Sequence, residues 1–164
     1  MASGQTLLVF TPQAGVPPAA NYATLDIRNN HTVWDFDAAV AESLNFESVM
    51  PRNYDGNGIT ATIIWSAATA VSGATRWLVS FERHQDDVDD IDSDSFATAQ
   101  AVNATAPATN GARSYDAVAF TDGAQIDSIA KGESFRLRIQ RDATNAADTM
   151  VGDAELARIE LRET

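Results

Sequence analysis

Hydrophobic and polar residues alternate with a period of two along much of this chain. The clearest run, SFRLRIQR at 134–141, places Phe135, Leu137 and Ile139 on one side and mainly charged side chains on the other. Successive side chains of a strand point to opposite faces, so this alternation is typical of a strand with one buried face. The runs ITATIIW at 59–65 and RWLVSFE at 76–82 follow the same pattern. The pattern therefore predicts strands as the main elements.

The alternation also predicts which side chains form the core. In the runs at 59–65 and 76–82 they are Ile59, Ala61, Ile63, Trp65, Trp77, Val79 and Phe81. The final run, AELARIELRE at 154–163, is expected to place Glu155, Ala157, Ile159 and Leu161 on one face and Arg158, Glu160 and Arg162 on the other. Weaker strand patterns occur at 6–10, 23–28, 42–49, 96–102 and 115–120.

Turn-forming segments such as PRNYDGNG at 51–58 and RDATNAAD at 141–148 separate these runs. Many short strands with regular turns are typical of a β-sandwich or barrel. We therefore predict an all-β fold, an antiparallel, jelly-roll-like β-sandwich of about eight or nine strands, formed by residues 1–164 as a single domain. The segment 35–44 also fits one helical turn, and 94–102 fits either a helix or a strand.

The N-terminal segment 1–18 combines a short apolar run, TLLVF, with the proline-rich sequence TPQAGVPP. Two interpretations stay open for it: an arm that pairs with a neighbouring subunit, or the first strand of the sandwich. The segment has no basic region before its apolar run, so we do not expect a signal peptide.

Composition narrows the classes of partner. The chain of 164 residues has a net charge of −12, one lysine, ten arginines and no cysteine. Such a charge repels phosphate backbones, so we expect no nucleic-acid partner, and no apolar run is long enough to predict a membrane span. The absence of cysteine excludes thiol chemistry and thiolate metal sites.

The stretch HQDDVDDIDSDS at 84–95 holds six aspartates between Asp86 and Asp94. It fails as an EF-hand loop, because a start at Asp90 puts Ser95 where the glycine is needed and Ala101 where the bidentate glutamate is needed. We expect a solvated, extended acidic loop, and a calcium site built from several loops is the alternative.

Candidate chemistry is sparse elsewhere. The two histidines, His31 and His84, belong to no recognisable motif, and no nucleophile elbow, zinc motif or phosphate loop occurs. We therefore predict no catalytic, cofactor-binding or metal-ligating residues and no enzyme activity. Trp65 and Trp77 are expected in the core, whereas Trp34, beside Asp35 and Asp37, is the tryptophan expected to be half-exposed and able to stack on a sugar.

Two stretches, 34–69 and 135–161, together resemble a family of small virion proteins of tailed bacteriophages. The residues that carry the resemblance are Trp34, Asp35, Phe36, Asp37, Glu42, Phe46, Pro51, Tyr54, Asp55, Gly56, Trp65, Arg141, Asp142, Asp148, Thr149, Asp153, Ala154 and Leu156. They mark a structural frame rather than an active site, and the acidic segment 86–94 lies outside the pattern.

The resemblance implies a jelly-roll virion component, most simply a head decoration (cement) protein. Such a protein would sit as a homotrimer on the capsid exterior, in contact with the major capsid protein and without a cofactor. The alternative is a tail or spike β-sandwich that binds host glycan, with or without calcium at the aspartate loop. A hydrolase on the same scaffold is a third hypothesis, and it requires a pocket with two carboxylates.

Overall fold

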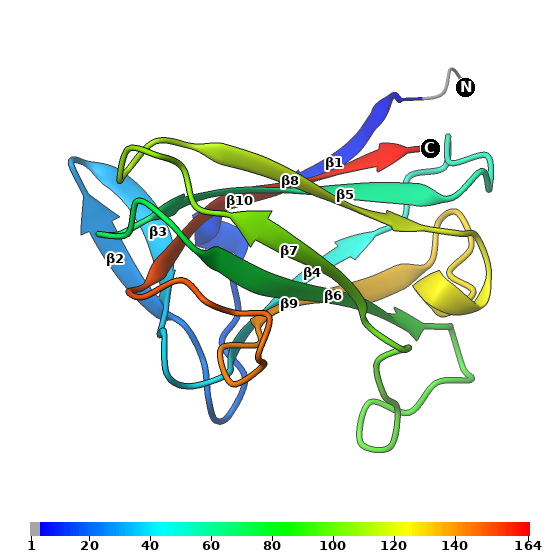
Figure 1. Cartoon of the computed structure of the whole chain (residues 1–164). Helices are drawn as coiled ribbons and strands as arrows, with labels where there is room; N and C mark the ends of the chain where they lie inside the picture. Colours follow the sequence, from blue (N-terminus) through cyan, green and yellow to red (C-terminus); the bar gives the residue numbers. More distant parts are fainter. Residues whose placement is uncertain (1–3) are drawn as a thin grey trace.

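The computed structural model describes residues 4–164, which form two antiparallel β-sheets packed face to face (Figure 1). Sheet A has the order β2-β3-β10-β5-β8, with β1 also paired to β10. Its strands are β1 (Thr6–Phe10), β2 (Thr24–Arg28), β3 (His31–Phe36), β5 (Ile59–Ala67), β8 (Ser114–Phe120) and β10 (Ala154–Glu163). Sheet B has the order β4-β9-β6-β7 and contains β4 (Glu42–Val49), β6 (Ala74–His84), β7 (Gln100–Thr105) and β9 (Ser134–Arg141).

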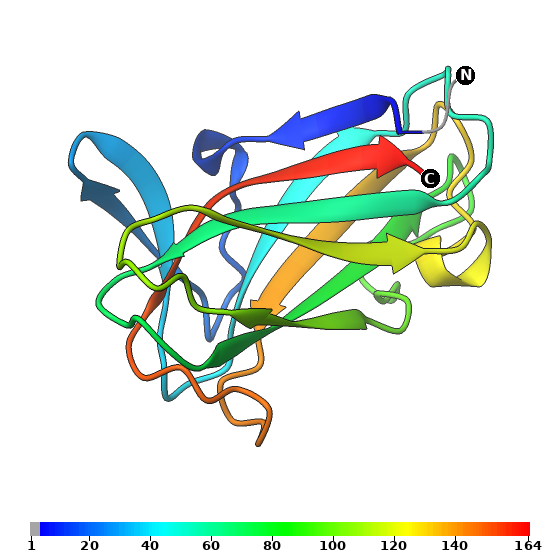
Figure 2. The ribbon, with the colours of Figure 1, turned by 45° about the horizontal axis from the view of Figure 1, so that its top comes forward.

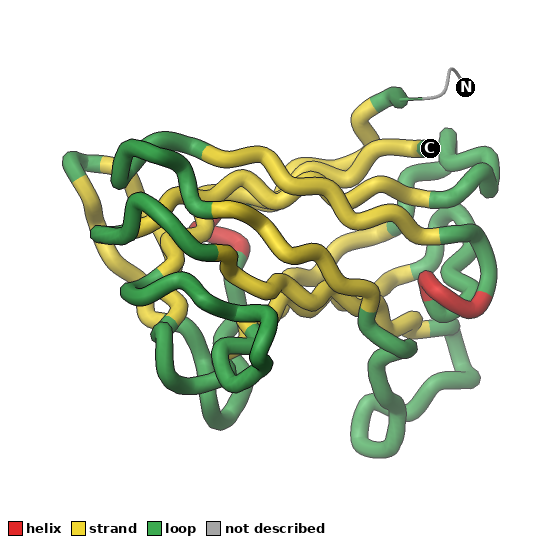
Figure 3. Tube along the Cα trace, in the orientation of Figure 1, coloured by secondary structure: helices red, strands yellow, loops and turns green. Residues whose placement is uncertain are grey.

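The predicted all-β, jelly-roll-like sandwich is confirmed, with ten strands rather than eight or nine. Among residues 4–164, helix is confined to two short 3-10 segments, η1 (Pro12–Ala14) and η2 (Ala124–Ile126), as Figure 3 shows. Within residues 4–164, no helix has the length and apolar character needed to cross a membrane.

The predicted core faces of β5, β6 and β9 are confirmed, since every side chain assigned to them is fully buried. Aromatic rings connect the two sheets. Trp77 of β6 meets Trp65 of β5 with ring centroids 5.9 Å apart and Phe36 of β3 at 5.1 Å, both edge to face. Edge-to-face pairs add to the stabilisation from burial alone. Both tryptophans therefore lie in the core, as predicted.

The N-terminal segment is part of the sandwich. β1 pairs with β10 of the same chain, from Thr6 opposite Arg162 to Phe10 opposite Ile159, and the two strands run side by side in Figure 2. This is the arrangement expected from the first-strand interpretation of residues 1–18. Residues 1–3 of that segment lie outside the described residues.

The segment 35–44 does not form the helical turn that its sequence allows. Asp35 and Phe36 end β3, a strand that the sequence analysis missed. The Asp37 side chain then accepts hydrogen bonds from the backbone N–H groups of Ala39 and Val40, at 2.5 and 3.1 Å. A carboxylate that takes up these N–H groups favours a turn over a continuing helix. The other ambiguous segment, 94–102, supplies the start of β7.

β10 departs from strict alternation at Ala157. Leu156 pairs with Trp65 of β5, and Arg158 pairs with the next residue, Ile64, so Ala157 has no residue opposite it on β5. One extra residue in one strand of an antiparallel pair is a β-bulge. A bulge shifts the phase of the alternation by one residue, so it changes which side chains face the core.

The predicted faces of β10 are accordingly wrong on the N-terminal side of the bulge. The core contains Ala154, Leu156, Ile159 and Leu161, whereas Glu155 and Ala157 do not join it. Ile159 and Leu161, beyond the bulge, lie on the predicted face. Glu155 instead contacts Arg28 and Ser66 on the outer side of sheet A.

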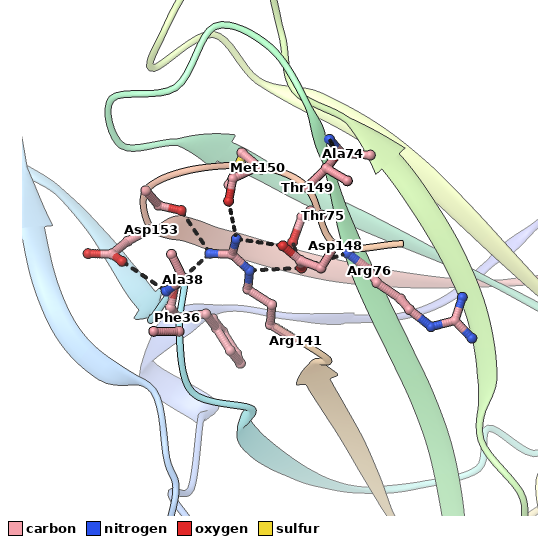
Figure 4. Close-up of polar contacts among 12 residues, drawn as sticks. Phe36, Ala38, Ala74, Thr75, Arg76, Arg141, Asp148, Thr149, Met150 and Asp153 are labelled. Carbon is pink, nitrogen blue, oxygen red and sulfur yellow. Dashed lines mark hydrogen bonds and ion pairs between the residues drawn. The ribbon is translucent and has the colours of Figure 1, made fainter. Parts of the chain in front are cut away.

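A buried arginine, Arg141, connects several segments at the end of the sandwich where β9 and β3 end (Figure 4). All five N–H donors of the Arg141 guanidinium have acceptors. Two go to the Asp148 carboxylate at 3.1 and 2.9 Å, and three go to the carbonyl oxygens of Phe36, Met150 and Gly152. Full satisfaction of this kind is what keeps a buried charge tolerable in the interior.

Asp148 also ties this arginine to sheet B. Its Oδ2 atom accepts hydrogen bonds from the Thr75 hydroxyl at 3.1 Å and from the backbone N–H of Arg76 at 2.9 Å, both on β6. The Arg141 and Asp148 side chains are 0% and 1% exposed. Both residues carry the resemblance described above, and in this chain they form a structural joint with no donor left for a ligand.

We expect Arg141→Met to lower the free energy of unfolding by about 3–5 kcal/mol, because it leaves the Asp148 carboxylate buried without its counter-charge. The double variant Arg141→Met/Asp148→Asn should recover part of that loss. Urea denaturation of both variants and the wild type measures these differences. A loss below about 1 kcal/mol for the single variant would contradict a structural role for the joint.

Candidate functional site

Trp34 was expected to be half-exposed, and this prediction is wrong. The side chain is 7% exposed, and its indole N–H donates a hydrogen bond to the Pro12 carbonyl oxygen at 2.7 Å. The backbone at Gly15 passes so close that a Cβ there would lie 2.6 Å from the indole nitrogen. The proline-rich segment after β1 therefore covers Trp34, which cannot stack on a sugar.

The acidic segment 86–94 forms turns rather than the expected extended loop. The Asp89 carboxylate accepts a hydrogen bond from the backbone N–H of Gln85 at 2.6 Å and lies 3.3 Å from Nε of Arg83. Asp90 accepts from the backbone of Asp92 in the same manner. These carboxylates are used as local turn acceptors. Across residues 4–164, no group of three or more His, Cys, Asp or Glu side chains is arranged to hold a metal ion.

The two histidines lie in different parts of the molecule. His84 ends β6 in sheet B, with its Nε2 atom 3.8 Å from the Glu82 carboxylate. His31 begins β3 in sheet A and lines a groove. The structure therefore brings the predicted candidates to no common centre, and the groove beside His31 is the strongest candidate site.

The groove lies on the outer face of sheet A, the face turned toward the viewer in Figure 2, and encloses about 590 Å³. Segments far apart in the sequence form it: the β2–β3 hairpin, the bulge of β10, the end of β5 and the start of β8. Its lining residues are Arg28, Asn29, His31, Ile64, Ser66, Gly111, Arg113, Tyr115, Ala157 and Arg158. A smaller hollow of about 230 Å³ adjoins it and shares His31, Arg113, Ala157 and Arg158.

The local backbone explains why these side chains meet. Asn29 and Asn30 both have positive φ, at 47° and 63°, as the two-residue turn of a twisted hairpin requires. That turn sets Arg28 directly opposite His31. On the other wall, the bulge directs two consecutive residues, Ala157 and Arg158, to the same groove. Bulges commonly re-aim side chains in this way beside functional sites.

Arg28 is held in place by protein groups. Its Nη1 atom lies 2.6 Å from Glu155 Oε2 and 3.0 Å from the Ala67 carbonyl oxygen, and Ser66 Oγ donates to the same Glu155 oxygen at 2.9 Å. Gly111 makes room for this arginine, since a Cβ there would lie 2.8 Å from Arg28 Nη2. The Glu155 carboxylate is thus already paired with Arg28.

The side chains of the other two arginines, Arg113 and Arg158, have fewer protein partners. The Arg113 side chain reaches Ser66 Oγ with a single long contact of 3.4 Å, and the Arg158 side chain has no hydrogen bond or ion pair within residues 4–164. Burial lowers the pKa of the Arg113 guanidinium. Glu155 and Tyr115 oppose this effect, and the positive charges of Arg158 and Arg28 add to it. Three positive charges, those of Arg28, Arg113 and Arg158, therefore lie around one groove.

Tyr115 supplies an exposed aromatic ring at the groove. It is 67% exposed and stands on β8 opposite Ile64, which is also in the lining. Tyr115 was not predicted from the sequence, because the run at 115–120 shows only a weak strand pattern. Its alternation contained the necessary information, since Val118 and Phe120 are buried in the core and Tyr115 has the opposite parity.

Asp35 lies near the groove, on β3 opposite Glu155. Burial raises the pKa of the Asp35 carboxyl to about 6, and the neighbouring carboxylates of Asp153, Glu155, Asp26 and Glu42 raise it further. Its Oδ1 atom is buried without a hydrogen-bond partner. The charged form of Asp35 is therefore disfavoured in the folded protein.

We expect the stability of the protein to carry a pH signature from Asp35. Because its pKa is higher in the folded state, its contribution is full below about pH 4 and is lost as the pH rises through about 6. Asp35→Asn should raise the free energy of unfolding by about 1–2 kcal/mol at about pH 8, after allowance for solvent screening, and have little effect at about pH 4. Thermal unfolding at both pH values measures this, and an equal effect at both would contradict it.

Comparison with known proteins identifies solved structures with a similar fold. No protein-family model matches the sequence, and the comparison with curated proteins gives no match. Among solved structures, a family 35 carbohydrate-binding module from an environmental isolate matches with a TM-score of 0.55 and 15% identity, over 94% of this chain and 92% of that one.

Two further matches are xylan-binding modules. The CBM22-1 xylan-binding domain of Paenibacillus barcinonensis Xyn10C has a TM-score of 0.54 and 9% identity, over 99% of this chain and 96% of that one. The xylan-binding module CBM15 has a TM-score of 0.50 and 8% identity, over 96% and 97%. At such identities the likeness concerns the fold alone, because one fold hosts many functions. The chain thus has a β-sandwich fold shared with carbohydrate-binding modules.

Proposed function

We propose that this protein is a glycan-binding β-sandwich module and that the groove on the outer face of sheet A holds the glycan. The observation that carries the proposal is the presence of an exposed aromatic ring, Tyr115, in a hollow lined by arginines and by small polar and apolar groups. Recognition of a sugar requires a flat apolar surface for the ring face and polar groups at its edge.

This function corresponds to the alternative hypothesis from the sequence, a tail or spike β-sandwich that binds host glycan. The aromatic residue differs from the expected one, because Tyr115 takes the place assigned to Trp34. The fold shared with carbohydrate-binding modules supports the proposal. The groove lies on the opposite sheet from β6, which leads into the acidic segment 86–94, so the proposed binding does not depend on calcium at those aspartates.

We expect Tyr115→Ala to weaken glycan binding about tenfold, because loss of one aromatic stacking surface corresponds to roughly 1.4 kcal/mol. The glycan is first identified on an array of neutral and acidic oligosaccharides, and affinity is then measured by isothermal titration calorimetry. Tyr22→Ala is the matched control, since Tyr22 is 48% exposed and is not in the groove lining. Equal weakening by both substitutions, or no glycan bound by the wild type, would contradict the proposal.

A second candidate function is the capsid decoration role, with a homotrimer in contact with the major capsid protein. One observation favours it: β2 is an edge strand of sheet A, and its side chains Leu25 and Ile27 are 52% and 68% exposed. An exposed strand edge with apolar side chains is a surface on which another chain can pair.

For this role we expect a trimer by light scattering coupled to size-exclusion chromatography, with the same mass in calcium and in chelator. Ile27→Asp should convert that trimer to monomer, because a charge on the edge opposes strand pairing. Val71→Asp is the control, since Val71 is similarly exposed, at 55%, but lies outside the strands. A monomer at all concentrations would argue against a preformed trimer.

A further inference from the structure

We infer that the glycan bound in the sheet A groove is acidic and that Arg113 and Arg158 bind its carboxylate. This inference rests on the proposed function and adds the chemical class of the ligand. It starts from the distribution of charge, because the chain carries a net charge of −12 and yet gathers three of its ten arginines at one hollow.

The three arginines differ in how far the protein has neutralised them. Arg28 is paired with Glu155 at 2.6 Å, and Glu155 is 4% exposed. Arg113 and Arg158 have no ion pair within the described residues, and both line the main groove and the smaller hollow beside it. Both guanidinium groups thus line the two adjoining hollows, and apart from the Arg113 contact with Ser66 their donors are available.

Electrostatics favours an anion at this point. The positive charges of Arg158 and Arg28 repel that of Arg113, and partial burial limits the screening of this repulsion by water. Glu155 offsets part of the repulsion, but its carboxylate is already paired with Arg28. A carboxylate between Arg113 and Arg158 would relieve that repulsion. The forked geometry of guanidinium groups suits a carboxylate, which can accept two parallel hydrogen bonds.

The surroundings select the kind of anion. The overall negative field of the protein repels a dense polyanion such as a nucleic acid. Tyr115, in the same lining, offers a stacking surface for a sugar ring. A saccharide with one carboxylate per ring, such as a uronic or sialic acid residue, satisfies both the aromatic and the two arginines. A neutral saccharide would leave the two arginines without a counter-charge.

The test compares an acid with its neutral counterpart on the same ring. Oligogalacturonate and its methyl ester, and sialyllactose beside lactose, are titrated into the full chain by calorimetry at about 0.05 M and about 0.3 M salt. We expect the acid form of at least one pair to bind about tenfold or more tightly than its neutral form, with the preference reduced at the higher salt concentration. The two pairs distinguish a uronic from a sialic acid ligand.

The variants locate the preference. Arg113→Gln and Arg158→Gln should each reduce it to about threefold or less, while a retained melting temperature shows that the fold is intact. Arg162→Gln is the matched control, because it removes the same charge from β10, the strand that also carries Arg158, and Arg162 does not line the groove. Loss of the preference in Arg162→Gln as well would overturn the assignment to Arg113 and Arg158.

The outcomes separate the two proposals. Equal binding of the acid and neutral forms would support glycan binding in the groove and would overturn the inference that the ligand is acidic. Binding of sulfated saccharides alone would overturn the inference that the anionic group of the ligand is a carboxylate. Binding of no saccharide in either arm would overturn the proposed function and this inference with it.

Discussion

The architecture depends on the way β10 pairs with three other strands. On one side it pairs with β5 along nearly its whole length, and on the other it pairs with β1 near its end and with β3 near its start. Ala157, the extra residue, lies between the β1 and β3 pairings. The bulge there permits the change of partner, and it also places Arg158 in the groove. One backbone irregularity therefore determines both the branching of sheet A and the composition of its candidate site.

The Arg141–Asp148 joint stabilises the same end of the sandwich from the inside. It connects β9, β6 and the carbonyl oxygen of Phe36 at the end of β3, and Asp153, close in sequence, accepts a hydrogen bond from the backbone of Ala38. These contacts fix the end of β3, the strand whose first residue, His31, lines the groove. A rigid frame with a cationic hollow on one face is consistent with a binding module, because preorganised side chains lose less entropy on binding.

The core residues were predicted most accurately from the sequence in strands that bury a single face. The run at 134–141 belongs to a strand in the middle of sheet B, so simple alternation identified its core residues. Alternation failed at 154–163 because the bulge follows from the pairing of β10 with β1, β3 and β5, which no local pattern encodes. Trp34 was misjudged for a related reason, since the segment that covers it, around Pro12, is distant in the sequence. The groove could not be predicted, because Arg28, Arg113 and Arg158 meet only through the topology of sheet A.

The proposed saccharide site lies on the outer face of sheet A. The most direct measurement is a titration of the ¹⁵N-labelled protein with oligogalacturonate, or with sialyllactose if the array selects it, followed by NMR. We expect chemical-shift changes concentrated at the β2–β3 turn, at Arg113 to Tyr115 and at Ala157 and Arg158. Changes concentrated at the acidic segment 86–94 or on the outer face of sheet B, with the groove unaffected, would contradict it.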